Sequence, residues 1–144
     1  QEPLKIWGHI ENGGIVKADA PLITTQTLRV PVTDGHMAAV YVKFDRTPSK
    51  EEILARWASF SGEPQRLALP HAPAQFLQYC PEDDRPQTRL DRDRDGGMAV
   101  TIGRLRPDTL LDYKFVCLVH NTLRGAAGGA VLMAELLAAK GYFD

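Results

Sequence analysis

Residues 98–120, MAVTIGRLRPDTLLDYKFVCLVH, contain two apolar runs on either side of a short polar stretch. Both runs are rich in aliphatic, β-branched and aromatic residues, a composition typical of β-strands. The stretch RPDT, which contains Pro107, predicts a turn between them. We therefore expect two strands, over residues 98–105 and 110–120, separated by this turn.

Helical patterns lie on both sides of these strands. Downstream, the sequence predicts a helix of about twenty residues that starts near Thr122 and stops at Gly141. Upstream, residues 76–80 suggest a short strand, and TPSKEEILARWASF predicts a helix that opens with a capping box of Ser49 and Glu52.

Two further strands are expected nearer the N-terminus. Alternation of apolar residues predicts a strand over residues 27–32 and another over residues 37–44, with the turn PVTDGH between them. The two are expected to pair as a hairpin. Strands in runs, with helices between and after them, favour the α+β class: a mixed, mostly antiparallel sheet with helices packed on one face.

Length and composition limit the possible functions. With 144 residues and 44% hydrophobic content, the chain is expected to form a single domain with one sizeable core. Its 17 basic and 18 acidic residues predict no nucleic-acid partner and no anionic membrane partner. No apolar run approaches the ~20 residues that span a bilayer, and no signal peptide opens the chain, which favours the cytoplasm.

Cysteine and charge patterns add two expectations. Cys80 and Cys117 lie in apolar runs, so buried free thiols in a reducing compartment are favoured over a disulfide. For most of its residues, the stretch PEDDRPQTRLDRDRDGG, residues 81–97, is interpreted as a solvated loop with local ion pairs. The four histidines lack metal-ligand spacing, so no metal site is expected.

Candidate site residues occur in two places. In RVPVTDGH, Arg29 can hold a carboxylate and His36 can shuttle a proton, although an exposed turn histidine and a solvated arginine are the simpler interpretations. In HNTLRGAAGGA, Asn121 and Thr122 are N-cap candidates at a helix start where a nucleotide contact is conceivable. The small residues that follow are better explained by tight helix packing. No activated serine or cysteine nucleophile is evident.

Several motifs together resemble the archaeal and fungal branch of the aspartate-semialdehyde dehydrogenases. They are PLKIWG, RVPVTDGH, DRPQTRLDRD, GGMAVTIGRLR and HNTLRGAAGGAVLMAELLAAKGY, in the family's order and over nearly the whole chain. The resemblance implies a glyceraldehyde-3-phosphate dehydrogenase-like C-terminal domain. It also implies that His36 is the acid/base, that Arg29 binds the substrate carboxylate, and that Asn121 and Thr122 contact the cofactor, NADP.

The resemblance also implies a larger protein. Residues 1–144 would be part of a C-terminal catalytic and dimerisation domain, with the dinucleotide-binding domain and the catalytic cysteine upstream, and QEPLKIWG would be the end of a helix. A homodimer or dimer-based tetramer is implied, and the chain alone is expected to be inactive. Thr27 and Met37 depart from the family pattern, which leaves a related acyl reductase such as malonyl-CoA reductase open. A non-catalytic dimerisation module is the alternative from another class.

Overall fold

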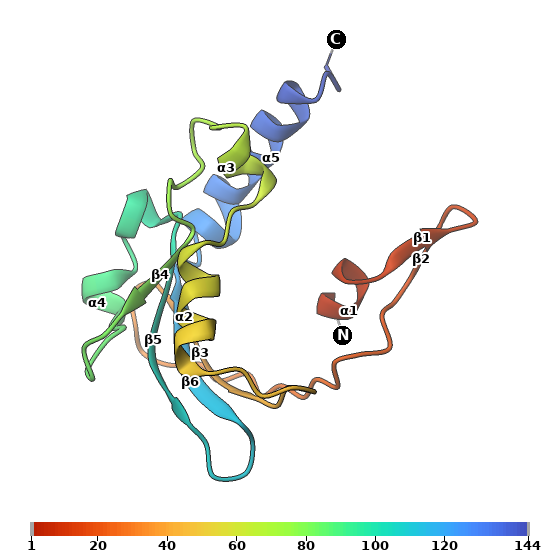
Figure 1. Ribbon diagram of the computed structural model, residues 1–144. Helices are drawn as coiled ribbons and strands as arrows, with labels where there is room; N and C mark the ends of the chain where they lie inside the picture. The colour runs from red at the N-terminus through yellow and green to blue at the C-terminus, as the bar shows by residue number, and fades with distance from the viewer. Residues whose placement is uncertain (1, 144) are drawn as a thin grey trace. The chain divides into compact units, whose positions relative to one another are not determined.

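The computed structural model describes residues 2–143 (Figure 1). They form two compact units, divided between Pro31 and Val32. The first unit contains helix α1 (Glu2–Ile6) and an antiparallel hairpin of β1 (His9–Glu11) and β2 (Gly14–Val16). The expected helix end in QEPLKIWG is confirmed, because α1 stops shortly before Gly8.

The hairpin of the first unit turns at Asn12 and Gly13, which both have positive φ, 50° and 78°. Asparagine followed by glycine is the pair that a tight hairpin turn favours, because both residues tolerate the left-handed region. Gly8 is required next to the second strand, since a Cβ there would lie 2.0 Å from the Val16 carbonyl oxygen.

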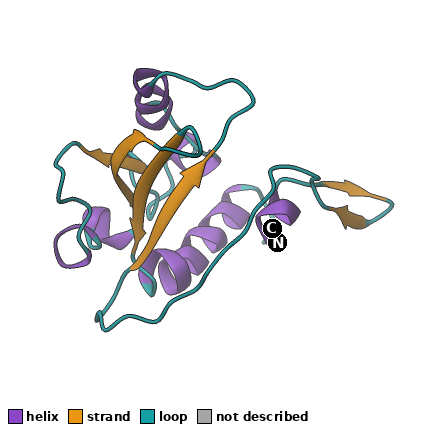
Figure 2. Cartoon of the chain, turned by 90° about the horizontal axis from the view of Figure 1, so that it is seen from below, coloured by secondary structure: helices purple, strands orange, loops and turns teal. Residues whose placement is uncertain are grey.

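The second unit is built on a four-stranded sheet with the strand order β3-β6-β5-β4. Its strands are β3 (His36–Val42), β4 (Leu77–Cys80), β5 (Val100–Pro107) and β6 (Tyr113–Val119). β6 pairs antiparallel with both β3 and β5, whereas β4 pairs parallel with β5. Figure 2 shows the four strands as one twisted sheet. The two strands expected around the RPDT turn are thus its central pair.

Helical segments connect and follow the strands. In chain order they are α2 (Lys50–Ala58), α3 (Glu63–Arg66), α4 (Thr88–Asp91), the 3₁₀ turn η1 (Arg94–Gly97), the π turn η2 (Leu123–Ala127) and α5 (Gly128–Ala139). The capping box is confirmed: Ser49 Oγ accepts from the Glu52 amide, and the Glu52 carboxylate accepts from the Ser49 amide. Gly141, at φ 74°, follows the last helix as expected.

Helix α2 covers one face of the sheet. Ile53 packs with Leu105 and Tyr113 in a buried cluster, which Trp57 and Phe115 extend with ring centroids 5.1 Å apart. A second cluster of Leu69, Met98 and Leu132 joins α5 to the segments beside η1. Both clusters lie within the second unit, which therefore carries its own core.

The other face of the sheet is covered only in part. The chain before α4 lies against β5, where a Cβ on Gly103 would be 2.3 Å from the Arg85 carbonyl oxygen. The outward side chains of β3, among them Met37 and Tyr41, are exposed by 50% and 59%. The α+β class with a mixed, mostly antiparallel sheet is confirmed, and an exposed patch remains beside β3.

The strand expected over residues 27–32 does not form, and neither does the hairpin with residues 37–44. β3 pairs with β6 instead. The apolar alternation gives these residues a preference for extended backbone, but Pro31 lacks the amide hydrogen that a ladder needs. The PVTDGH segment consequently does not act as a hairpin turn.

Candidate functional site

His36 is the first residue of β3 and is exposed. It follows a turn in which Gly35 is buried and has a φ of 112°. A Cβ on Gly35 would lie 3.1 Å from Leu118 Cδ1 and from Thr88 Cγ2, which is a tight fit, and the φ of Gly35 independently disfavours a side chain. The turn is thus pressed against the sheet and fixes where β3 and His36 begin.

Asn121 is hydrogen-bonded to this turn. The Gly35 amide donates to Asn121 Oδ1 at 2.7 Å, across 86 positions of sequence. Because the partner is a donor, the side-chain oxygen must face it, which directs Nδ2 elsewhere. Among the described residues Nδ2 has no hydrogen-bond partner. Asn121 therefore does not cap the helix through its side chain, and it presents a free amide donor.

The strand register explains why Asn121 lies beside the turn that precedes His36. His36 pairs with Val119, so β3 begins where β6 ends, and Asn121 lies two residues beyond Val119. The sheet thereby places His36 and Asn121 at the same end of neighbouring strands. Arg29, in contrast, belongs to the first unit, is exposed, and lies in a segment without regular structure.

Thr122 begins the helical segment and is exposed. Its amide, its hydroxyl and the Leu123 amide all approach His120 Nδ1, at 3.3, 3.2 and 3.3 Å. The acceptor for this helix start is therefore His120, which is only 6% exposed. Sequence reasoning considered this histidine only as a metal ligand and missed its contact with the helix amides.

The charged segment 81–97 is not simply a solvated loop. Asp91 is 1% exposed and accepts hydrogen bonds from Arg85, Arg94 and the Gln87 amide. The Arg85 guanidinium, followed by the Gln87 amide, lowers the pKa of the Asp91 carboxyl, although burial acts in the opposite direction. Local ion pairs are present as expected, but Asp91 is buried and not solvated, because Arg85, Arg94 and the Gln87 amide converge on it.

Two neighbours of Asp91 reach the candidate site. Arg92 Nη1 donates to the Asp34 carbonyl oxygen at 3.5 Å, in the turn before His36. Its Nε is buried without a hydrogen-bond acceptor in the described part of the chain and lies 3.4 Å from Asp93 Oδ2. Asp93 Oδ1 also lies 3.5 Å from His120 Nε2. The segment after α4 thus contacts both the turn before His36, through Arg92, and the start of the helical segment after β6, through Asp93 and His120.

Both cysteines are free thiols, as expected. Cys80 is buried and Cys117 is half-buried, and burial raises the pKa of each thiol. A thiol with a raised pKa is largely protonated at neutral pH and is a poor nucleophile. Neither cysteine is suited to covalent catalysis.

The small residues at the start of α5 serve packing at one position at least. A Cβ on Gly128 would lie 2.6 Å from Met98 Sδ, in the second core cluster. Gly125 differs, because among the described residues outside its own helical turn a Cβ there would meet only the His120 carbonyl oxygen, at 3.7 Å. Close packing thus accounts for Gly128, and Gly125 borders open space.

Met37 and His36 lie on opposite faces of β3, since successive side chains of a strand alternate. Met37 pairs with Leu118 and is half exposed. A larger side chain at position 37 therefore does not project beside the His36 ring. Met37 lies on the partly exposed face of the sheet instead.

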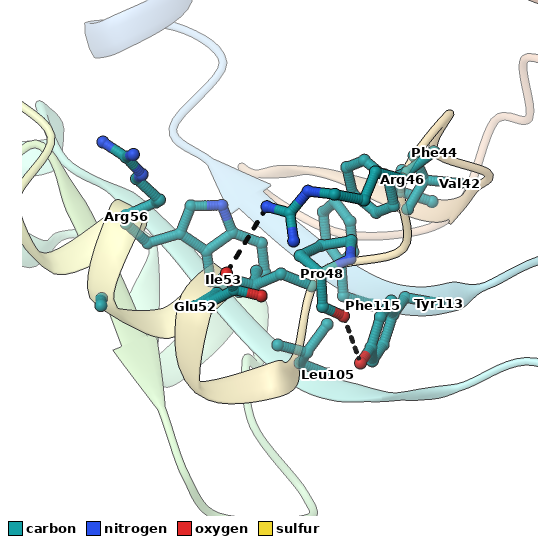
Figure 3. A pocket seen from close by; sticks show the side chains of 13 residues that line it. Val42, Phe44, Arg46, Pro48, Glu52, Ile53, Arg56, Leu105, Tyr113 and Phe115 are labelled. Carbon is teal, nitrogen blue, oxygen red and sulfur yellow. Dashed lines mark hydrogen bonds and ion pairs between the residues drawn. The ribbon is translucent and has the colours of Figure 1, made fainter.

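A cavity of about 550 Å³ lies between α2 and the sheet (Figure 3). At its rim Arg46 pairs with Glu52 at 3.5 Å, and inside it the Tyr113 hydroxyl donates to the Pro48 carbonyl oxygen at 2.9 Å. Its lining includes the core residues Ile53 and Leu105 and contains none of the predicted site residues. The cavity is thus part of the packing of α2 on the sheet.

Residues 2–143 contain no cluster of three histidine, cysteine, aspartate or glutamate side chains suited to a metal ion. Within the same residues, no helix combines the length and the apolar character needed to cross a bilayer.

Comparisons with known proteins show which proteins this chain is similar to. An aspartate-semialdehyde dehydrogenase of Archaeoglobus fulgidus is 44% identical over 137 residues, which cover 95% of this chain and 38% of that protein. A malonyl CoA reductase (NADP) of Metallosphaera sedula is 43% identical over 120 residues, which cover 82% of this chain and 34% of the relative.

Among solved structures, aspartate semialdehyde dehydrogenase with NADP from Candida albicans is similar with a TM-score of 0.86 and 37% identity. The match covers 99% of this chain and 41% of that one. The chain thus spans about two fifths of the length of such relatives. The profile of the semialdehyde dehydrogenase dimerisation domain matches residues 1–124. On this evidence, the chain belongs to the semialdehyde dehydrogenase dimerisation-domain family.

Proposed function

We propose that this chain is part of an NADP-dependent aspartate-semialdehyde dehydrogenase, which converts aspartyl phosphate to aspartate semialdehyde and releases phosphate. The observation that carries the proposal is the 2.7 Å hydrogen bond from the Gly35 amide to Asn121 Oδ1. It joins the turn that presents His36 to a side chain whose amide donor is free. The relatives named above support this choice of substrate.

In this proposal His36 is the acid/base. Its exposed ring at the start of β3 has room for a substrate, and imidazole exchanges protons near neutral pH. It would deprotonate a catalytic cysteine that a segment outside this chain supplies. It would later shuttle the proton of the thiohemiacetal hydroxyl, which must leave that oxygen when the C–S bond breaks and the aldehyde forms. The raised pKa values of the Cys80 and Cys117 thiols support an origin of the nucleophile outside this chain.

Arg29 would bind the substrate carboxylate, because a guanidinium matches a carboxylate with two parallel hydrogen bonds. Asn121 fits NADP, since its Nδ2 can donate to the carboxamide oxygen of the nicotinamide while Oδ1 remains bound to Gly35. Thr122, next in sequence and exposed, would border the same cofactor. NADPH supplies the hydride when it is bound, and these residues orient it against the acyl group.

The dinucleotide-binding domain of this enzyme would lie outside residues 1–144, which form part of the C-terminal catalytic and dimerisation domain. We therefore expect no dehydrogenase activity from the 144-residue chain alone. The exposed face of β3, with Met37 and Tyr41, would contact a second copy in a homodimer, from which a tetramer can be built. Two free thiols suit a reducing compartment, in accord with a cytoplasmic enzyme of amino-acid biosynthesis, on the route to lysine, threonine and methionine.

Malonyl-CoA reduction is the second candidate, and the 43% identity to a malonyl CoA reductase supports it. Both substrates carry a carboxylate for Arg29. The position of Met37 on the face opposite His36 removes one reason to prefer this alternative.

The test uses the full-length protein with two substrates: aspartate semialdehyde with phosphate and NADP, and malonyl-CoA with NADPH. We expect activity with the first pair, and a loss of roughly 10²–10⁴-fold in kcat for His36→Ala. His9→Ala, at an exposed histidine of β1, is the matched control and keeps full activity. Activity only with malonyl-CoA selects the alternative. Inactivity with both substrates supports a non-catalytic dimerisation module.

A further inference from the structure

The helix that follows β6 starts in an unusual way. The first amides of a helix need acceptors, which are most often a serine, threonine, aspartate or asparagine side chain at the N-cap. Asn121 and Thr122 are of that type, yet neither side chain accepts from a helix amide. Instead, His120 Nδ1 accepts from the Thr122 and Leu123 amides, both at 3.3 Å.

These contacts determine the tautomer of His120. Because Nδ1 faces two amide donors, it carries the lone pair, and the ring proton is on Nε2. Nε2 lies 3.5 Å from Asp93 Oδ1. A carboxylate next to one ring nitrogen favours the tautomer in which that nitrogen is protonated, and this leaves the other nitrogen as the acceptor. Asp93 therefore supports the arrangement in which His120 serves the helix.

Gly97 makes room for the imidazole. A Cβ at this position would lie 3.2 Å from His120 Cδ2 and 2.7 Å from Leu123 Cδ1. The φ of Gly97, 78°, independently disfavours a side chain. The ring is thus enclosed by the segment that also contains Asp93, and it is only 6% exposed.

We propose that His120, oriented by Asp93, is a positioning residue for the site. By accepting the helix amides, His120 releases Asn121 from the capping role, so that Asn121 Oδ1 can hold the Gly35 amide and Nδ2 can face the cofactor. Without an acceptor at position 120, the Asn121 side chain can take over as the acceptor for the helix amides. If it turns toward them, its hydrogen bond to the Gly35 amide breaks. The inference rests on the proposed function only for the identity of the cofactor.

The test compares His120→Asn with His120→Leu in the full-length protein. Asparagine places an oxygen close to the position of Nδ1, so His120→Asn keeps the acceptor, and His120→Leu removes it. We expect His120→Leu to weaken NADP binding roughly fivefold to tenfold, the effect of losing a cap. His120→Asn stays within about twofold of wild type on the same scale. Titration calorimetry measures the NADP affinity, and steady-state kinetics then show a raised KM for NADP with a smaller change in kcat.

Hydrogen exchange at the Gly35 amide gives a readout that needs no cofactor. His120→Leu speeds its exchange, whereas His120→Asn leaves it protected. Asp93→Leu shifts both readouts in the same direction by a smaller factor. Asp83→Asn changes neither, because Asp83 is exposed and its side chain makes no hydrogen bond or ion pair with the described residues.

Equal behaviour of the Asn and Leu variants, in NADP binding and in Gly35 exchange, would overturn the role of His120. If the wild-type protein binds no NADP, the proposed function is contradicted instead. Hydrogen exchange at the Gly35 amide then tests the role of His120 by itself. If His120→Leu fails to fold, the other two variants decide. The inference is contradicted if Asp93→Leu matches wild type in NADP affinity and Gly35 exchange and if the Gly35 amide loses its protection in His120→Asn.

Discussion

The two units of this chain differ in how they bury their apolar side chains. In the first unit no described residue is buried, and Leu22 is 97% exposed. In the second unit Leu118 is 1% exposed, and the unit contains two clusters of buried apolar side chains. Burial of apolar surface is the main stabilising contribution in folding. The second unit therefore has a buried core of its own, whereas the first unit leaves its apolar side chains exposed.

The largest expected effect concerns the buried carboxylate of the second unit. Asp91→Asn removes the charge that Arg85 and Arg94 share, and loss of one member of a buried ion pair costs roughly 3 kcal/mol or more. Urea unfolding of the 144-residue chain, monitored by circular dichroism, measures this cost. A change below about 1 kcal/mol would show that Asp91 is not part of the core.

The same network has a defined pH dependence. Because the pKa of the Asp91 carboxyl is lowered in the folded state, its stabilising contribution is complete above the unfolded value of about 3.9. That contribution is lost as the pH falls below about 3.9 toward the lower folded value. The stability difference between wild type and Asp91→Asn should thus be constant near neutrality and shrink in acid. A constant difference down to pH 2 would contradict the assigned pKa direction.

The core of the sheet provides the next effect. Leu118→Ala removes a side chain that is 1% exposed and that packs against the Gly35 turn, and we expect a loss of about 3 kcal/mol. Because the turn precedes His36, the full-length variant should also lose activity. Stability measured by urea unfolding and activity measured on the same variant test the two consequences separately. Unchanged activity would show that the packing of Leu118 does not affect the position of His36.

A smaller effect is expected at the start of α2. Ser49→Ala removes the cap of the Glu52 amide and should cost about 1 kcal/mol of unfolding free energy. Ser59→Ala, whose hydroxyl only approaches the Arg56 carbonyl oxygen at 3.4 Å at the other end of α2, is the matched control. Equal losses in the two variants would argue against the capping box as the specific cause.

The smallest effect sharpens the comparison of the two units. Leu22→Ser should change the stability of the 144-residue chain by less than about 0.5 kcal/mol, because this side chain is already in water. In the full-length protein the same substitution should be destabilising if other parts of the protein cover this surface. Thermal unfolding of both forms gives the answer. A large loss in the short chain would show that the first unit has a core of its own.

Sequence patterns predicted the elements that rest on local rules. Nearby residues alone determine three of them: the capping box at Ser49, the two central strands on either side of the turn at Pro107, and the end of the last helix at Gly141. The strand over residues 27–32 was wrong, because a strand also needs a partner and the alternation says nothing about which one is available.

The candidate site was predictable in its residues and not in its connections. His36, Arg29, Asn121 and Thr122 follow from the family resemblance, whereas the bond from Gly35 to Asn121 spans 86 positions and depends on the sheet register. Asp91 and His120 were misjudged for a related reason. A charged or polar residue is buried when partners converge on it in space, and one sequence does not show that convergence.

The central claim is that Asn121 and the turn before His36 form one site. Hydrogen exchange at the Gly35 amide tests it most directly, in wild type and in Asn121→Leu. The structure predicts a protected Gly35 amide in wild type and a loss of protection of tenfold or more in the variant, at about 1.4 kcal/mol per factor of ten. A Gly35 amide that exchanges in the wild-type chain as fast as an unstructured peptide would contradict the account.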